Sequence, residues 1–389
     1  MNNTTLFMRD KPKIFFPNLD GLRFVSFILV FFSHSMGKLT EANASGNALI
    51  DQPLLFIFGN GKMGVSVFFV LSGFLITYLI LSEIQSFGRL DVRSFYVRRT
   101  LRIWPLYFAV LIFAFLVFPL LQSFLAGGLA DTSRPLFYVT FLSNFDVIHM
   151  QETHAYQNLF LTVTWSIAIE EQFYLAWPLF FHFMPQRFFK WIFLSIIAAS
   201  VLFMICNIHR EHVLSFHTFS AVFDLAAGGL AAWCALHSAR FVSFFGQMPF
   251  RSRLAIYLCG LLLLIFRHTL FSFEYGFILK KFIAVLYFAF VILDQNFNGS
   301  LRMKFSRSAF MSKWGRYTYG LYLLHTIALL VVAKIFIMAG YETERGLLST
   351  TGYTLISLLL TFLLAWLSYN YFEKYFLRLK ARFSYITKE

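Results

Sequence analysis

Charged residues are scarce in this sequence. Asp, Glu, Lys and Arg make up 13% of its 389 residues, whereas 58% are hydrophobic and 53 are phenylalanine. This composition excludes an ordinary soluble globular protein and indicates a chain that lies in a lipid bilayer. Cysteine is rare as well. Cys206, Cys234 and Cys259 fall in predicted helices at no metal-ligand spacing, so we expect them to pack rather than to form a disulfide framework.

Familiar catalytic motifs are also missing from the sequence. It contains no Walker loop, no G-x-S-x-G and no paired metal motif. His209 and His212 stand three residues apart in a gap between apolar stretches, but no further ligands accompany them. We therefore predict no metal site and no bound cofactor.

Long apolar stretches recur along the whole chain, and a transmembrane helix needs about 20 such residues. The sequence predicts an all-α, polytopic membrane protein with about ten transmembrane helices, in one domain over residues 1–389 with a tail from about residue 373. The first stretch is too long for a cleavable signal peptide, so it is expected to remain as the first helix. Small residues in "LSGFL" and "DLAAGGLAA" are expected where helices approach closely. The predicted spans are 15–37, 63–82, 103–125, 163–184, 189–208, 218–237, 253–271, 276–294, 316–338 and 350–372.

Lysine and arginine alternate with the predicted helices. The formal net charge is +14, and 23 basic residues lie in the two tails and the even-numbered gaps, against 6 in the odd-numbered gaps. The positive-inside rule then predicts that both termini are cytoplasmic and that the number of spans is even. Topology accounts for most of the positive charge, so no nucleic-acid partner is predicted.

Ionisable residues inside membrane spans are costly and therefore mark functional candidates. Asp20 and Arg23 are three apart on the first predicted helix, where either structural pairing or ligand contact would explain them. His34 follows Arg23 by eleven residues, about 16 Å along a helix, and taken alone could simply cap the helix near the outer surface. Glu170 and Glu171 lie at a similar depth on an oppositely running helix. A carboxylate beside an imidazole can fix its tautomer and raise its basicity.

A basic segment precedes the third predicted span. Asp91 is expected to cap a helix there, and Pro105 lies near the point where the chain enters the membrane. Arg98, Arg99 and Arg102 share one side of this helix, because they are three and four residues apart. For His325, in the later segment "YTYGLYLLHT", we expect a structural hydrogen bond to a neighbouring helix.

The ordered motifs resemble the acyltransferase-3 family of integral membrane acyltransferases. They are "LDGLRFVSFILVFFSHS", "GVSVFFVLSGFLI", "FYVRRTLRIWPLYF", "TWSIAIEEQFYLAWP", "FDLAAGGLAAW" and "YTYGLYLLH". The resemblance implies transfer of an acyl group, commonly acetyl, from cytoplasmic acyl-CoA to a hydroxyl of a cell-surface or lipid-linked glycan. It also implies that the residues matching Arg23 and His34 are essential. Some members add a C-terminal hydrolase-like domain, which this sequence lacks, so acceptor selection is expected from the membrane part or a partner.

We therefore predict that His34 acts as general base on the acceptor hydroxyl, with Glu170 or Glu171 orienting its imidazole. Direct attack on the thioester and an acyl-histidine intermediate both remain open at this stage. The predicted location is the bacterial cytoplasmic (inner) membrane. The competing hypothesis is a transporter or flippase of lipid-linked sugars that uses the same intramembrane charges to line a pathway.

For the acyl-CoA co-substrate, the predicted binding residues are Arg23, Arg98, Arg99 and Arg102. Guanidinium groups grip phosphate oxygens in forked pairs, which suits the donor head. The acyl arm would then thread toward His34. The acceptor, its modified hydroxyl, the acyl chain length and the oligomeric state are not determined by the sequence.

Overall fold

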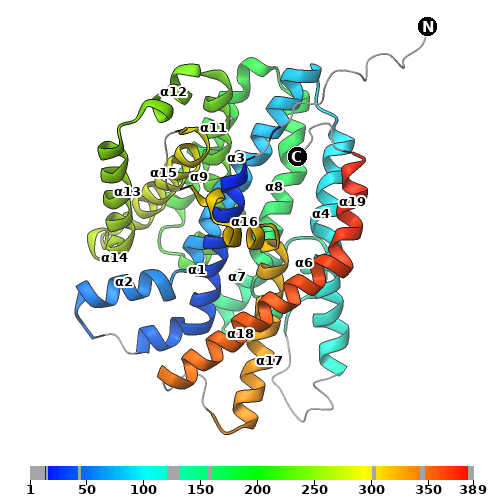
Figure 1. Cartoon of the computed structure of the whole chain (residues 1–389), viewed down its shortest axis with the longest axis vertical. Helices are drawn as coiled ribbons and strands as arrows, with labels where there is room; N and C mark the ends of the chain where they lie inside the picture. Colours follow the sequence, from blue (N-terminus) through cyan, green and yellow to red (C-terminus); the bar gives the residue numbers. More distant parts are fainter. Residues whose placement is uncertain are drawn as a thin grey trace.

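A computed structural model describes residues 14, 16–42, 45–120, 132–155, 159–299, 304–341 and 347–383 of the chain, and in these ranges every regular element is a helix (Figure 1). The predicted all-α class is confirmed. The longer helices are α1 Pro17–Ala42, α3 Gly61–Phe87, α4 Val92–Ile112, α8 Thr164–Phe183, α9 Phe189–Cys206, α11 Thr218–His237, α13 Phe250–Ile265, α15 Gly276–Phe297, α17 Thr318–Met338 and α18 Leu347–Ser368. The shorter ones are α2 Ala48–Phe58, α6 Pro135–Val139, α7 Ser143–Thr153, α10 Glu211–Phe216, α12 Ala239–Gln247, α14 Arg267–Leu270, α16 Ala309–Arg316 and α19 Lys374–Ala381.

The number of candidate membrane spans is eight, or nine if a bent pair is counted, within the described residues. The sequence predicted about ten, and the polytopic membrane fold is confirmed with slightly fewer candidate spans. Two predicted spans account for the difference. Helix α8 has 20 residues, but Glu170, Glu171 and Gln172 make it too polar to count. Helix α13 has only 16 residues and is long enough to cross a membrane only together with α12, and the two meet at an angle of 93°.

The third predicted span begins earlier in the structure than the sequence indicated. Helix α4 starts at Val92 and continues through Pro105 and a π-helical turn at Phe113–Val117, so one span covers Val92–Leu120. Asp91 caps this helix as predicted, because its Oδ1 accepts a hydrogen bond from the Ser94 backbone N–H at 2.9 Å. The basic segment is thus continuous with the span rather than a separate surface helix.

Helices α3 and α11 form the closest contact in the core. A side chain at Gly73 would collide with the backbone of Leu225, and one at Gly228 would collide with the backbone of Val70. The glycines in "LSGFL" and "DLAAGGLAA" therefore allow backbone-to-backbone packing, which confirms their predicted role. The buried network around this contact continues into α8 through Trp177, whose indole N–H donates to Thr77 Oγ1 at 2.9 Å.

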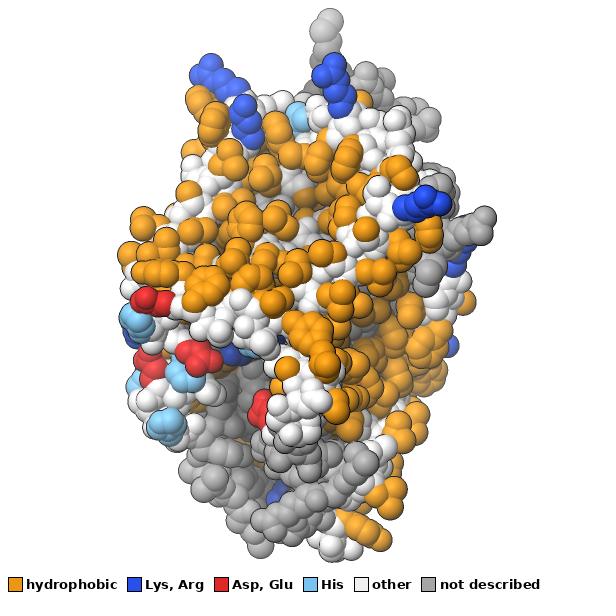
Figure 2. All heavy atoms as spheres, turned by 90° about the vertical axis from the view of Figure 1, so that its left-hand side faces the viewer, with side chains coloured by type: hydrophobic (Ala, Val, Ile, Leu, Met, Phe, Trp, Pro, Cys, Tyr) orange, Lys and Arg blue, Asp and Glu red, His pale blue; other side chains and the backbone are white. Residues whose placement is uncertain are grey.

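The outer surface of the bundle is hydrophobic. Figure 2 shows a broad band of hydrophobic side chains across one side of the molecule, with Lys and Arg above it and acidic and histidine side chains below it. Exposed leucines such as Leu258, Leu286 and Leu359 belong to the helices that carry this surface. Cys206 and Cys259 are also exposed and free, so they do not pack in the core as expected. Such a surface fits contact with lipid tails.

Candidate active site

A cavity of about 950 Å³ opens beside the C-terminal half of α1. It is lined by side chains from α1, α2, α3, α10, α11, α14 and α15, and by Tyr322 of α17. Ser33 and His34 lie on its α1 wall, and the His34 ring is open to it. Gln52 of α2 and Gln151 of α7 also line the cavity. The candidate catalytic histidine thus faces a space large enough for a sugar.

The imidazole of His34 contacts a second imidazole, that of His325 on α17. The two rings meet edge to edge with their planes nearly parallel, at 12°; their centroids lie 5.2 Å apart, and His34 Nδ1 lies 2.9 Å from His325 Nε2. His325 Nδ1 lies 2.7 Å from the backbone oxygen of Tyr322. Both interactions are hydrogen bonds, and 291 residues of sequence separate the two histidines.

These two hydrogen bonds assign the protons of the pair. A carbonyl oxygen can only accept, so His325 Nδ1 carries the proton that bonds to Tyr322. In a neutral ring His325 Nε2 is then the acceptor, and His34 Nδ1 must be the donor. His34 Nε2 is left without a proton. This is the tautomer that a general base needs, because the free lone pair lies on the nitrogen that the bond to His325 does not use.

Helix α17 holds His325 rigidly. The His325 side chain has no exposed surface, and the rings of Phe27 and Phe31 lie 5.9 and 6.2 Å from its ring. Tyr322, one turn earlier, shares a hydrogen bond of 2.7 Å with Ser166 of α8 through its hydroxyl group. The expected bond from His325 to a neighbouring helix is confirmed, but the sequence did not reveal that its partner is His34. The only signal was a titratable residue inside an apolar span.

The two glutamates predicted to orient His34 have other partners. Glu170 Oε1 accepts from Ser72 at 2.8 Å and Glu170 Oε2 accepts from the Tyr174 hydroxyl at 3.1 Å. Glu171 Oε2 accepts from the indole N–H of Trp104 at 2.8 Å and is 3% exposed. Neither carboxylate is a hydrogen-bond partner of His34 within the described residues, and His325 occupies the position expected for them.

The predicted pair on α1 forms in the structure. Arg23 Nη1 lies 2.7 Å from Asp20 Oδ1, and the side chains are 25% and 11% exposed. The guanidinium is therefore neutralised on one side and still reachable on the other. The structure brings Arg23 and Glu170 within electrostatic range of each other, together with Arg99.

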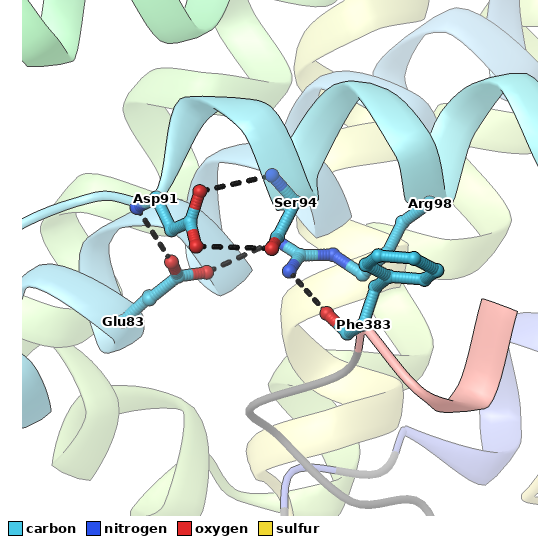
Figure 3. A network of polar contacts seen from close by, with 5 residues as sticks. All are labelled: Glu83, Asp91, Ser94, Arg98 and Phe383. Atoms are coloured by element: carbon cyan, nitrogen blue, oxygen red, sulfur yellow. Dashed lines mark hydrogen bonds and ion pairs between the residues drawn. The ribbon is translucent and has the colours of Figure 1, made fainter.

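Arg98 is engaged in a network at the start of α4 (Figure 3). Its guanidinium donates to Glu83 Oε2 at 3.0 Å and to the backbone oxygen of Phe383 at 2.8 Å. Glu83 Oε1 also accepts from the Asp91 N–H at 2.9 Å, and Asp91 Oδ2 accepts from the Ser94 hydroxyl at 2.9 Å. Arg98 thus ties the end of α3 and the chain after α19 to the start of α4.

The other two arginines of α4 differ from Arg98. Arg99 lies over the rings of Phe95 and Tyr174, with its guanidinium carbon 5.6 and 5.4 Å from their centroids. Its Nε has no hydrogen-bond partner within the described residues. Arg102 interacts electrostatically with Glu373. The structure therefore places the three predicted donor-binding arginines of α4 in three different environments.

Comparisons with known proteins agree on one kind of domain. A family model described as an acyltransferase domain matches residues 16–370. A protein named "Putative O-acetyltransferase" in Staphylococcus aureus (strain COL) is 30% identical over 222 residues, covering 54% of this chain and 33% of the relative. Peptidoglycan O-acetyltransferase OatA of Listeria monocytogenes is 31% identical over 203 residues, covering 49% of this chain and 27% of the relative.

These matches span about a third or less of the relatives' own length. No solved structure matches the chain. Within the described residues, no group of three or more His, Cys, Asp or Glu could hold a metal ion.

Proposed function

This chain belongs to the acyltransferase-3 family, and from that premise we propose that it is a membrane O-acyltransferase. The reaction moves an acyl group, most simply acetyl, from acyl-CoA to a hydroxyl of a cell-surface glycan such as peptidoglycan. The names of the relatives support the acetyl group and the glycan class. The observation that carries the proposal is that His34 lies on the wall of a large cavity and bonds to His325 through Nδ1, which leaves Nε2 as the nitrogen available to act as a base.

In the proposed mechanism, His34 Nε2 takes the proton of the acceptor hydroxyl as its oxygen attacks the thioester carbonyl. The C–S bond then breaks, the acyl ester forms, and the imidazolium returns the proton to the leaving thiolate of CoA. His325 keeps Nδ1 of His34 in the donor role throughout, and this hydrogen bond holds the His34 ring in place. The orienting role predicted for Glu170 or Glu171 thus passes to His325.

The donor is proposed to approach from the opposite end of the bundle. Arg23, Arg99 and Arg102 offer positive charge on α1 and α4. Arg23 is still partly exposed, and Arg99 Nε has no hydrogen-bond partner within the described residues, whereas Arg98 bonds to Glu83 and Phe383. Phosphate oxygens of acyl-CoA suit these guanidinium groups. Glu170, between Ser72 and Tyr174, would lie along the path of the acyl arm.

The proposed location is the bacterial cytoplasmic membrane, with both termini in the cytoplasm. The asymmetric distribution of Lys and Arg in the sequence supports this orientation. The cavity of His34 would then open to the outside, where the acceptor glycan lies. Acyl-CoA would bind from the cytoplasm.

Transfer of label from [¹⁴C]acetyl-CoA to a glycan by the purified protein tests the function. We expect His34→Ala to lower kcat by about 10²- to 10⁴-fold, since general-base catalysis contributes about that much. His182→Ala is the matched control, because His182 is an exposed histidine at the end of α8. Wild-type protein that leaves no labelled ester on any glycan but moves lipid-linked sugar across a bilayer would favour the transporter hypothesis instead.

A further inference from the structure

The cavity of His34 has a basic wall that the proposed chemistry does not use. Arg267 and His268 belong to α14, and Lys280 lies one turn into α15; all three line the cavity together with His34. Figure 2 shows this side of the molecule, where charged and histidine side chains gather below the hydrophobic band. The wall lies on the part of the cavity that is proposed to face the acceptor.

Arg267 is buried and rigidly held, yet it has no carboxylate partner within the described residues. Its side chain is 9% exposed. Nη1 donates to the backbone oxygen of Leu264 at 2.8 Å, and Nη2 donates to Oδ1 of Asn60 in a short hydrogen bond. Both acceptors are neutral. Burial lowers the pKa of Arg267 to about 10, so the guanidinium remains charged at neutral pH. Two of its five N–H groups make these bonds, and others remain to bind a ligand.

Two other buried cations in the same bundle each have a carboxylate partner. Arg253 lies 3.2 Å from Asp294, and Lys281, adjacent to Lys280, lies 2.7 Å from Asp224. A buried charge normally requires such a partner, because its desolvation is expensive. The absence of one at Arg267, in the part of the chain that the structure describes, sets this residue apart.

Its neighbours increase the local positive charge. Arg267 and Lys280 both act electrostatically on His268, and together with burial they lower the pKa of His268 to about 4. His268 is therefore neutral at pH 7 and can donate a hydrogen bond. Glu211 lines the same cavity and attracts Lys280 electrostatically, so it offsets part of this charge, but it does not act on Arg267 as a hydrogen-bonded carboxylate partner within the described residues. Two like charges held at one wall cost free energy unless an anion lies between them.

We propose that Arg267 and Lys280, with His268 and Asn60 in support, form a subsite for an anionic group of the acceptor, a carboxylate or a phosphate. Asn60 fixes the guanidinium, and the guanidinium grips two oxygens of the group. The sugar that carries the group then extends across the cavity toward His34. This inference rests on the proposed function, because it assigns one part of its acceptor.

Equilibrium binding to the purified full-length protein in lipid nanodiscs tests the subsite without turnover. Two pairs of probes differ only or mainly in charge: N-acetylmuramic acid with its methyl ester, and N-acetylglucosamine 1-phosphate with N-acetylglucosamine. We expect the wild-type protein to bind at least one charged probe more tightly than its neutral partner. Arg267→Gln should reduce that preference by about 10-fold or more, the usual effect of losing a hydrogen bond between charged groups.

Three further variants serve as comparisons and as a control for Arg267→Gln. Arg267→Lys keeps the charge and should retain part of the preference, and Lys280→Gln should give a smaller loss than Arg267→Gln, because Lys280 is only half-buried. Arg240→Gln removes an exposed arginine of α12 and should change nothing. Thermal unfolding of each variant shows whether Arg267→Gln still folds. If Arg267→Gln does not fold, the subsite is tested by the preference of the wild-type protein for charged probes and by the loss of that preference in Lys280→Gln.

Two outcomes overturn the subsite. One is equal binding of charged and neutral probes by the wild-type protein in both pairs. The other is an Arg267→Gln variant that loses affinity for acetyl-CoA and none for the sugars, which would make this wall a donor phosphate site. A protein that shows the Arg267-dependent preference but transfers no acetyl group would refute the proposed function and leave the subsite in place.

Discussion

His325→Ala is the perturbation that most directly tests how the catalytic histidine is set up. The substitution removes the acceptor for His34 Nδ1–H at 2.9 Å and, with it, the ring against whose edge the His34 ring lies. His34 is then free to carry its proton on Nε2, where it can no longer act as a base, and its ring is free to turn away from the cavity. Substrate contacts of the cavity stay in place.

Two comparisons set the expected fall in kcat of the His325→Ala variant. Loss of the His34 base altogether should cost about 10²- to 10⁴-fold in kcat. Loss of a partner that only orients a working histidine typically costs about 10- to 100-fold. We therefore expect kcat of His325→Ala to fall by about 10- to 100-fold, with little change in KM for either substrate.

The assay is acetyl transfer to a fixed glycan, measured over a range of both substrates. His325→Gln is the conservative variant, since its amide oxygen can accept from His34 Nδ1, and it should recover part of the lost kcat. In a His34→Ala background, His325→Ala should have no further effect on kcat, because there is no imidazole left to orient. A single His325→Ala variant with kcat within about twofold of wild type, or an undiminished effect in the double variant, would refute the reasoning. Thermal unfolding is the folding control, because His325 is fully buried.

Two further predictions concern packing and the donor. Gly73→Val should prevent correct folding, because its side chain would collide with the Leu225 backbone; the readout is loss of monodisperse protein after extraction. Gly299→Ala is the control, because its added Cβ meets nothing within 4 Å. A normal yield of the Gly73→Val protein would contradict the contact between α3 and α11. Arg102→Gln should raise KM for acetyl-CoA by about 10-fold, whereas Arg98→Gln should lower thermal stability more than donor affinity, because Arg98 already bonds to Glu83 and to the chain after α19. Unchanged donor affinity in the Arg102 variant would remove that residue from the donor site.

The sequence predicted the membrane class and the approximate position of each long helix, because runs of apolar residues report directly on burial in lipid. The sequence was less accurate for helices whose length fits a membrane span but whose polarity does not. Helix α8 has the length of a span, but its two adjacent glutamates and Gln172 make it too polar to count as one. Near α12 and α13, composition alone did not indicate the 93° bend. Bends depend on contacts between distant segments, which a hydropathy profile does not contain.

For the candidate site, the sequence singled out His34 as an ionisable group in an apolar stretch, and it placed Asp20 and Arg23 on one helix face, where they do pair. It also predicted a hydrogen bond from His325 to another helix. It did not predict the right partner for His34, because Glu170 and Glu171 matched it in depth along the membrane normal, and depth says nothing about rotation of a helix about its own axis.

The sequence by itself thus determined the chemical parts: a helical membrane protein, a histidine near one end of the first span, and arginines near the other end. The tertiary structure decided which parts meet. Packing of α17 against α1 brings together two imidazoles 291 residues apart in the sequence and joins them by a hydrogen bond, and the turn from α13 into α15 places Arg267 on the wall of the same cavity. Local sequence specifies helices through short-range periodicity, whereas the rotation and pairing of those helices depend on close packing across the whole bundle.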